Sequence, residues 1–379
     1  MTASVHLPGS TLGILGSGQL GRMLALTAKR LGYRVHVFSP ERDTPAGQVA
    51  DLEIAADYTD LPALKHFAQG VDVVTIEFEN IPVQALAALQ PEVPVYPQPH
   101  VLEITQHRLR EKQFLSDLGI PVVPFVPVNN LQELQAGMTQ LGLPAVLKTA
   151  GFGYDGKGQV RLESEAQALD AYEAFAGQAC VMERFLDLER EISVIAARAE
   201  DGTFQAYRPV ENRHRNHILD FTLAPAQISE TIEAQALQIT QRIMEALNMR
   251  GLLCVEFFIT RQGELLVNEL APRPHNSGHY TIEAAVCDQF EQQLRVVCGL
   301  PLGDPALRQP AAMANVLGDL WANGEPDWQS ALARSPVYLH LYGKQEARVG
   351  RKMGHLTTLG DSVDAAFQLA KQARERLNR

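Results

Sequence analysis

Two acidic residues in neighbouring apolar stretches are placed to bind one metal ion. Glu256 stands in LLCVEFF and Glu269 in LLVNELA. If Arg261-Gln262-Gly263 is the turn between two antiparallel strands, Glu256 lies across from Asn268 and Glu269, with Cβ atoms about 5 Å apart. Two close, partly buried carboxylates repel each other unless they share a proton or a cation. The spacing therefore predicts a magnesium site that also holds substrate phosphates, with a structural, salt-bridged pair as the alternative.

The stretch GFGYDGKGQV, residues 151–160, has the composition of a phosphate-binding loop. It departs from the P-loop pattern G-x-x-x-x-G-K-[ST] at Gly158, where a hydroxyl is needed. The next residues alternate as in a strand, so we expect the loop to be the tip of a hairpin. Backbone N–H groups beside Lys148 and Lys157 suit a polyphosphate, and we expect the loop to close over such a ligand as a lid. The alternative is a surface hairpin that binds nothing.

A second glycine motif, GSGQLG, follows the first apolar stretch and opens a helical pattern. Gly16, Gly18 and Gly21 fit the dinucleotide fingerprint G-x-G-x-x-G, and the acidic Glu41 follows about twenty residues later. This pattern predicts a nicotinamide cofactor in one interpretation, and the protein would then be an NAD-dependent oxidoreductase. In the other interpretation the glycines only permit a tight strand-to-helix turn.

A polar loop, NELAPRPHNSGH, follows directly after the second strand of the carboxylate hairpin. Arg273 in such a loop suits the oxygens of a carboxylate or a phosphate. A zinc-binding H-x-x-x-H pair lies on a helix, whereas His275 and His279 are expected in a loop, so we reject a zinc site here.

The elements that must position these motifs fall into three regions. Residues 1–105 alternate strand and helix, which predicts a doubly wound parallel α/β sheet that ends after the proline-rich PQPHV. Residues 106–190 predict a compact α+β unit that carries the glycine-rich loop, with the pattern interrupted by the prolines of PVVPFVPV. Residues 191–379 begin with longer strands, and the first hairpin is expected to turn at Asp201-Gly202.

Composition excludes several classes of protein. The 379 residues carry a net charge of −11, which argues against binding a nucleic-acid backbone. No apolar run approaches the roughly 18–20 residues of a membrane span, and the N-terminus is not a signal peptide, so we expect a cytoplasmic protein. The four cysteines show no C-x-x-C spacing and are expected to be buried free thiols.

Together the phosphate hairpin, the carboxylate pair and the parallel N-terminal domain resemble the ATP-grasp ligases. GYDGKGQ, NELAPRPHNSGH, GSGQLGRM and GRKMGHL resemble the ATP-grasp family that carboxylates aminoimidazole ribonucleotide, from Leu12 to about Leu359. The resemblance implies an ATP-grasp fold behind a pre-ATP-grasp domain. It implies ATP, bicarbonate and aminoimidazole ribonucleotide as substrates, Mg²⁺ or Mn²⁺ as the metal, carboxyphosphate as intermediate and a role in purine biosynthesis. A homodimer and a separate mutase chain for the next step are also implied. A sister ligase that uses formate or glycine is the rival within the superfamily.

The resemblance also assigns site residues. Those that would bind ATP are Arg108, Lys148, Gly153, Tyr154, Asp155, Gly156, Lys157, Gly158, Gln159, Glu183, Arg184, Phe185, Leu186, Glu191, His214, Asn268 and Glu269. Those that would bind the ribonucleotide are Gln19, Glu77, Tyr154, Arg273, His275, Asn276, Lys344, Arg351 and Lys352. The metal ligands would be Glu256 and Glu269, and the catalytic residues Lys148, Asp155, Arg273 and His275. Family members often have glycine where this chain has His217.

Overall fold

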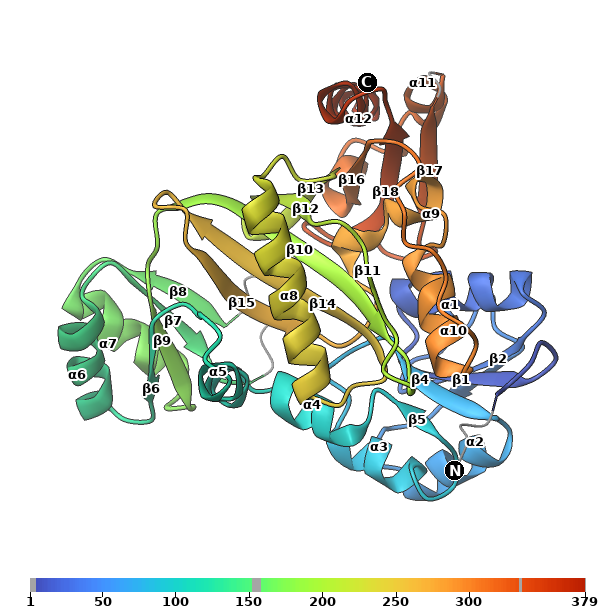
Figure 1. Cartoon of the computed structure of the whole chain (residues 1–379), viewed down its shortest axis with the longest axis horizontal. Helices are drawn as coiled ribbons and strands as arrows, with labels where there is room; N and C mark the ends of the chain where they lie inside the picture. The colour runs from blue at the N-terminus through green and yellow to red at the C-terminus, as the bar shows by residue number, and fades with distance from the viewer. Residues whose placement is uncertain (1–4, 152–157, 334–335, 379) are drawn as a thin grey trace.

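The computed structural model describes residues 5–151, 158–333 and 336–378, and these form three β-sheets. Figure 1 shows the four-stranded sheet standing to one side, the long strands of the nine-stranded sheet in the middle and the five-stranded sheet below them on the other side. The nine-stranded sheet therefore adjoins both smaller units, and the candidate site residues lie along its strands and at its borders.

The N-terminal sheet is fully parallel, in the order β3-β2-β1-β4-β5. Its strands are β1 (Thr11–Leu15), β2 (Arg34–Ser39), β3 (Leu52–Ala55), β4 (Val73–Ile76) and β5 (Val95–Tyr96). Its helices are α1 (Gln19–Arg30), α2 (Leu61–Gln69), α3 (Val83–Leu89) and α4 (Pro99–Thr105). Side chains of α1 pack on one face together with α10 (Gln289–Val297) from much later in the chain, and those of α2 and α3 pack on the other face. The doubly wound parallel sheet is confirmed.

Helix α4 was not predicted, because PQPHV has the composition of a linker. Pro99 occupies the first turn of the helix, where the missing N–H costs no hydrogen bond. Val101 and Leu102 are buried, so tertiary packing stabilises this short helix.

The four-stranded antiparallel sheet has the order β6-β9-β7-β8. Its strands are β6 (Phe125–Val128), β7 (Ala145–Thr149), β8 (Gln159–Leu162) and β9 (Cys180–Arg184), and α6 (Leu131–Leu141) and α7 (Glu165–Ala174) pack against it. The expected interruption at PVVPFVPV is wrong, since β6 forms there. Pro127 is tolerated because β6 lies at the edge of the sheet.

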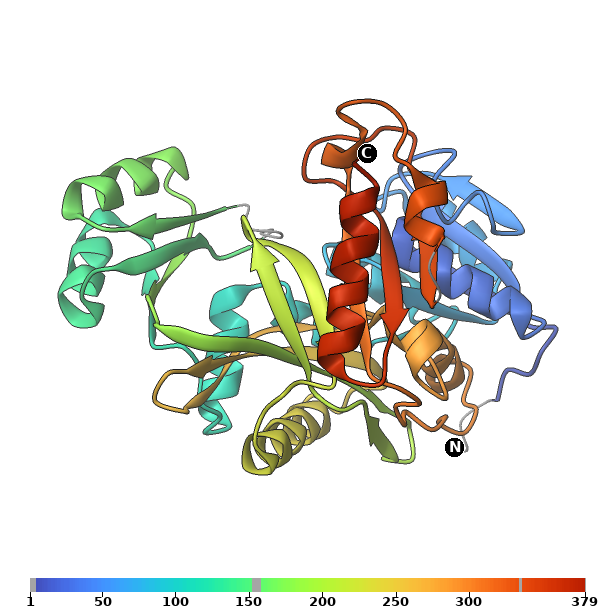
Figure 2. The ribbon, with the colours of Figure 1, turned by 90° about the horizontal axis from the view of Figure 1, so that it is seen from above.

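The nine-stranded sheet follows the order β15-β14-β10-β12-β13-β16-β18-β17, with β11 paired to β10. Its strands are β10 (Leu188–Arg198), β11 (Phe204–Ala206), β12 (Val210–Arg215), β13 (Ile218–Ala224), β14 (Gly251–Thr260), β15 (Leu265–Ala271), β16 (Ala311–Leu317), β17 (Val337–Leu341) and β18 (Lys352–Leu359). Helix α8 (Glu230–Ala246) packs across β10 and β14, and α12 (Val363–Arg376) lies along β16 and β18, as Figure 2 shows. The remaining helices are α5 (Arg108–Asp117), α9 (Thr281–Ala284), α11 (Trp328–Leu332) and the 3-10 turns η1 (Asn276–Gly278) and η2 (Gly318–Trp321).

Both predicted hairpins are present. Strands β10 and β11 turn at 199–203, and β14 and β15 turn at 261–264. All four cysteines are buried free thiols, as expected. Within the described residues, no helix combines the length and the apolar character that a membrane span requires.

Candidate active site

Glu256 and Glu269 face each other across the β14–β15 hairpin, as the sequence predicts. The ladder then shifts by one residue, so that the next pair is Phe257 with Val267 and Asn268 is the extra residue of a β-bulge. Glu256 is 15% exposed, whereas Glu269 is exposed, so the expectation that both carboxylates are partly buried is wrong for Glu269. Burial and the neighbouring Glu269 raise the pKa of Glu256 to about 8. The doubly ionised pair is therefore unfavourable unless a proton or a cation relieves the repulsion.

His275 joins this pair from the polar loop after β15. Its Nε2 lies 3.3 Å from Glu256 Oε1. Its Nδ1 accepts from the backbone N–H of Ser277 at 3.3 Å and lies 2.8 Å from the Ser277 hydroxyl. Because Nδ1 accepts, the neutral ring carries its proton on Nε2 and donates toward Glu256. Burial and the nearby Arg273 lower the pKa of His275 well below its usual range, which keeps the ring neutral.

A chain of buried polar side chains holds the Ser277 hydroxyl that contacts the His275 ring. Asn212 donates to the hydroxyl of Ser193 at 3.0 Å, and that hydroxyl lies 2.8 Å from Ser277 Oγ. Thr222 donates to the Asn212 carbonyl at 3.1 Å, which fixes the amide orientation. Strands β10, β12 and β13 thus hold the Ser277 hydroxyl in place. Ser193, Asn212 and Thr222 were not predicted, because only the fold brings these strands together.

Arg273 forms a two-bond ion pair with Glu79 of the N-terminal domain. Arg273 Nη2 donates to Glu79 Oε1 at 2.6 Å, and Arg273 Nε donates to Oε2. Burial alone would raise the pKa of Glu79, but the guanidinium outweighs it and lowers that pKa. Glu79 was missed at the sequence level, although it stands two residues after Glu77 in EFEN, directly after a buried strand. The pair places Arg273 at the border between two sheets.

The glycine turn after β1 already holds an anion of the protein itself. Glu77 follows β4 and accepts from the N–H of Gly18 at 2.9 Å and of Gly21 at 3.2 Å. The carboxylate therefore occupies the position at the start of α1 where a dinucleotide pyrophosphate would bind. A side chain at Gly16, where φ is +93°, would collide with Glu77, so glycine is required there. Gln19 begins α1 beside this turn.

The predicted phosphate hairpin has the expected topology. Strands β7 and β8 pair antiparallel, with Lys148 opposite Gln159, and Thr149 N–H donates to Gly158 O at 2.8 Å. The stretch therefore joins two strands and is not a P-loop. The predicted residues Gly153, Tyr154, Asp155, Gly156 and Lys157 lie outside the described residues.

Two lysines meet one buried glutamate behind this hairpin. Glu183 Oε2 lies 2.7 Å from Lys148 Nζ, and Oε1 lies 2.9 Å from Lys112 Nζ. Burial would raise the pKa of Glu183, but the two ammonium groups lower it to about 2. Lys112 was not predicted, since a lysine in an amphipathic helix is ordinarily solvated. Arg108, one helical turn earlier on α5, donates to Thr149 O at 2.8 Å.

The other residues expected around ATP lie near the junction of the four-stranded and nine-stranded sheets. The chain leaves β9 at Arg184 and continues through Phe185 and Leu186 to β10. Phe185 is exposed, and the guanidinium carbon of Arg161 lies 4.0 Å from the centroid of its ring. On β10 and β12, Glu191 Oε2 lies 2.9 Å from His214 Nδ1. Desolvation lowers the pKa of His214, but the hydrogen bond to Glu191 and the negative charges of Glu191 and Glu256 together outweigh this effect and raise the pKa.

His217 lies at the turn after His214. Asn216 and His217 connect β12 and β13 with φ values of +51° and +64°. This left-handed conformation explains physically why glycine suits the position. His217 Nδ1 lies 3.4 Å from Gln159 Nε2, so the turn approaches the base of the phosphate hairpin.

Of the three basic residues expected around the substrate phosphate, Lys352 lies near Glu79 and Glu256. Its positive charge contributes a lowering effect to the pKa of each of Glu79, Glu256, His214 and His275. Lys344 Nζ lies 5.8 Å from the centroid of the Tyr342 ring.

Arg351 donates to Glu346 O at 3.0 Å.

Asn276 is held by an amide that sequence reasoning missed. Asn315 on β16 donates to Asn276 Oδ1 at 2.7 Å, and Asn276 donates back at 3.2 Å. Asn315 also donates to Leu219 O at 2.7 Å and is buried. Nothing in the surrounding NVLGD sequence distinguishes this asparagine from an ordinary strand residue.

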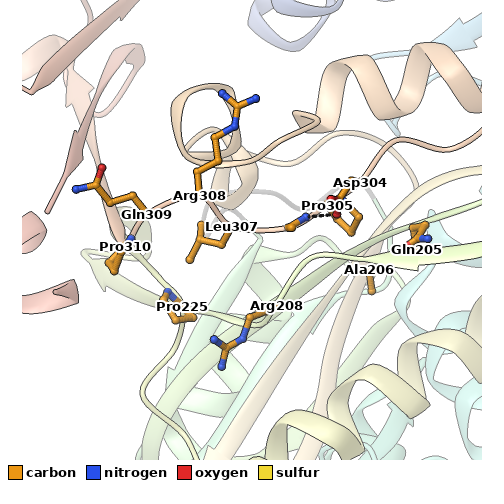
Figure 3. A pocket seen from close by; sticks show the side chains of 11 residues that line it. Gln205, Ala206, Arg208, Pro225, Asp304, Pro305, Leu307, Arg308, Gln309 and Pro310 are labelled. Atoms are coloured by element: carbon orange, nitrogen blue, oxygen red, sulfur yellow. Dashed lines mark hydrogen bonds between the residues drawn. The ribbon is translucent and has the colours of Figure 1, made fainter. Parts of the chain in front are cut away.

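A hollow of about 480 Å³ lies elsewhere, between the β11–β12 connection and residues 304–310 (Figure 3). Arg208 there is held by Glu233 through two bonds of 2.8 and 2.9 Å, and Arg308 donates to Val286 O. No predicted site residue lines this hollow.

Family comparisons match almost the whole chain. A ribonucleotide synthetase preATP-grasp domain matches residues 10–106, an ATP-grasp domain matches residues 113–290, and a phosphoribosylaminoimidazole carboxylase C-terminal domain matches residues 311–368. With the carboxylate hairpin and the phosphate hairpin, these matches define an ATP-grasp ligase.

Curated relatives narrow the class. The N5-carboxyaminoimidazole ribonucleotide synthase of Bacillus subtilis is 42% identical over 368 residues, covering 97% of this chain and 96% of the relative. That of Brucella melitensis is 44% identical, covering 93% and 97%. The chain belongs to the family of N5-carboxyaminoimidazole ribonucleotide synthases. It also matches a bifunctional purine synthesis protein of Dictyostelium discoideum at 43% identity, but spans only 38% of that protein.

Solved structures agree over the full length. The ADP complex of an N5-carboxyaminoimidazole ribonucleotide synthetase superposes with a TM-score of 0.92 at 41% identity, covering 100% of both chains. The Aspergillus clavatus synthase in complex with ADP and 5-aminoimidazole ribonucleotide gives 0.90 at 30% identity, covering 98% of this chain and 99% of that one.

Proposed function

We propose that the protein carboxylates the amine of 5-aminoimidazole ribonucleotide with ATP and bicarbonate, in de novo IMP biosynthesis. Bicarbonate is a poor electrophile because its leaving group would be hydroxide. A bicarbonate oxygen attacks the γ-phosphorus of ATP, ADP leaves and carboxyphosphate forms. The amine then attacks the carboxyl carbon, or carbon dioxide released from it, and phosphate leaves. The observation that carries the proposal is the group formed by Glu256, Glu269, His275 and Arg273, at the border of the nine-stranded sheet and the N-terminal domain.

The carboxylate pair fits a divalent cation. The two side chains are directly opposite, and without a cation their repulsion adds to burial in raising the pKa of Glu256. Mg²⁺, or Mn²⁺ in its place, would be held by Glu256 and Glu269 and would neutralise charge on the transferring phosphoryl group. Oxygen ligands of this kind suit these hard cations.

ATP would lie between the four-stranded sheet and β10–β15. Lys148 and residues 153–159 would face the phosphates, and residues 183–186 the adenine. Glu191 and His214, already hydrogen-bonded to each other, would face the ribose hydroxyls, with Arg108 and Asn268 beside the nucleotide. Phosphoryl transfer asks the protein mainly for such positioning and charge neutralisation.

The ribonucleotide would lie against the N-terminal domain. Its base and ribose would meet Gln19, Glu77, Tyr154 and Asn276, and its phosphate would meet Lys344, Arg351 and Lys352. Glu77 is fixed by the N–H groups of Gly18 and Gly21, which gives the substrate side a rigid carboxylate. Arg273, held by Glu79, would stabilise the carboxyphosphate oxygens.

His275 acts best as a hydrogen-bond donor. Its Nδ1 accepts from Ser277, so Nε2 carries the proton. Nε2 lies 3.3 Å from Glu256 Oε1 and would donate to a reacting oxygen bound beside that carboxylate. The amine proton then passes to the phosphate that leaves, or to Asp155. Arg273 and Lys148 would supply positive charge, and closure of the glycine-rich loop would protect the labile carboxyphosphate from water.

We further propose a division into an N-terminal substrate-side domain (1–105), an ATP-grasp lid subdomain (106–190) and a C-terminal subdomain with the metal site (191–379). The working unit would be a homodimer. A separate mutase chain would take the product.

The test is ADP release with purified protein. We expect turnover only when aminoimidazole ribonucleotide, bicarbonate and magnesium are present together. Full turnover with formate or glycine and another ribonucleotide, without turnover of these substrates, would point to a sister ligase.

A further inference from the structure

Lys112 is a fully buried cation for which the proposed mechanism has no use. It is 1% exposed, and its Nζ approaches Glu183 Oε1 at 2.9 Å and the Phe125 ring centroid at 5.8 Å. Glu183 is 3% exposed, and its other oxygen is taken by Lys148, which is 13% exposed. One buried carboxylate therefore joins one fully buried lysine and one partly exposed lysine.

Lys112, Lys148 and Glu183 together carry a net charge of +1. Which lysine stays with Glu183 decides which lysine is left to bind another anion. Burying an unpaired carboxylate is strongly unfavourable, so Glu183 must keep at least one cation. If Lys148 were its only partner, moving Lys148 to a ligand would leave Glu183 unpaired. Lys112 removes this restriction, because it stays with Glu183 when Lys148 turns to another anion.

The two lysines reach Glu183 from different elements and approach different oxygens of its carboxylate. Lys112 comes from α5, whose first residue, Arg108, donates from its side chain to Thr149 O of β7 at 2.8 Å and from its backbone N–H to Ala150 O at 2.8 Å. Lys148 lies on β7 opposite Gln159, at the base of the phosphate hairpin. The fully buried lysine thus enters from the helix, and the partly exposed one stands where the hairpin begins.

We propose that Lys112 is a positioning residue for ATP: it remains the permanent partner of Glu183 and so allows Lys148 to exchange from Glu183 to the nucleotide phosphates. The inference rests on the proposed function. It assigns a role in phosphate recognition to a side chain that does not touch the nucleotide. A merely structural Lys112–Glu183 pair would stabilise the fold without affecting phosphate affinity.

The test compares the wild type, Lys112→Met and the double variant Lys112→Met/Glu183→Gln. In Lys112→Met, Lys148 must stay with Glu183, so MgATP should bind about ten-fold more weakly, the loss expected for one charge-assisted hydrogen bond. AMP, which lacks the outer phosphates, should bind as to the wild type. In the double variant Glu183 no longer needs a cation, so the ratio of MgATP to AMP affinity should return to within about three-fold of wild type.

Calorimetric titration with MgATP and with AMP measures both affinities, and thermal unfolding confirms that each variant is folded. The proposal is overturned if Lys112→Met loses affinity for MgATP and for AMP equally. It is also overturned if the double variant has the same ratio of MgATP to AMP affinity as Lys112→Met. If Lys112→Met does not fold, the double variant decides alone, because an affinity ratio far below wild type contradicts the exchange. A wild-type protein that does not bind MgATP contradicts the proposed function instead.

Discussion

Glu79 and Arg273 join the N-terminal domain to the nine-stranded sheet through two hydrogen bonds between one carboxylate and one guanidinium. Both side chains are largely buried, at 20% and 14% exposure. The pair fixes the orientation of the Arg273 guanidinium at the border between the N-terminal domain and the nine-stranded sheet. That orientation therefore depends on how both units are placed.

We predict that Glu79→Gln lowers kcat/KM for aminoimidazole ribonucleotide about ten-fold, because Arg273 loses its bidentate partner. The KM for ATP should change little, since the site proposed for the nucleotide lies on the other side of the carboxylate hairpin. Steady-state kinetics with each substrate varied measures both values. Glu92→Gln is the matched control, because Glu92 pairs with Lys65 on the surface at 3.2 Å. Equal losses for both variants would contradict a specific role of Glu79.

Glu269→Gln should reduce kcat by roughly 10²-fold, because the proposed metal ligand beside the transferring phosphoryl group loses its charge. The same change removes the repulsion that contributes to the raised pKa of Glu256, so the metal-free protein should melt at the same or a slightly higher temperature. Glu264→Gln, at the exposed tip of the same hairpin, is the control. Normal turnover by Glu269→Gln at ordinary magnesium would show that the carboxylate pair is structural.

Gly158→Ala should weaken ATP binding. Gly158 has φ of +69°, and a Cβ there would lie 2.5 Å from Thr149 Oγ1, so the base of the phosphate hairpin must distort. We expect a cost of about 1–2 kcal/mol and a rise of roughly ten-fold in the KM for ATP. Gly119→Ala is the matched control, with φ of +65° and no atom within 4 Å of the added Cβ. If Gly119→Ala raises the KM equally, the effect is general destabilisation.

The protein should lose stability as the pH falls below about 6.5. Burial lowers the pKa of His279 and His355 well below the usual range, so the folded state keeps both rings neutral while the unfolded state takes up protons. The stabilisation is present above pH 6.5 and decreases on acidification, by about 1 kcal/mol per histidine between pH 7.5 and 5.5. Urea unfolding at the two pH values measures it. His355→Gln should show a smaller decrease than the wild type, and an equal decrease would contradict this origin.

The local part of the site could be predicted from the sequence because it lies within single hairpins. The register of β14 and β15 follows from turn position and side-chain alternation, and it placed Glu256 opposite Glu269 correctly. The β-bulge at Asn268 did not follow, because a bulge is set by packing on both sides of the sheet. The exposure of Glu269 was missed for the same reason.

What the sequence did not predict depends on contacts between distant segments. Glu79, Lys112 and Asn315 gain their roles from partners 194, 71 and 39 residues away. Each stands in an ordinary strand, helix or loop context, where its residue type alone indicates a solvated or local side chain. The assigned roles of the individual site residues stay predictions.

The most direct test of the central claim follows the oxygen atoms of bicarbonate. In the reaction proposed here, a bicarbonate oxygen attacks the γ-phosphorus of ATP, so the phosphate finally released contains one oxygen from bicarbonate. With ¹⁸O-labelled bicarbonate, ATP, magnesium and aminoimidazole ribonucleotide, mass spectrometry should find one ¹⁸O in each phosphate formed. Unlabelled phosphate released at the full rate of product formation would show that water cleaves the ATP and would contradict carboxyphosphate as the intermediate.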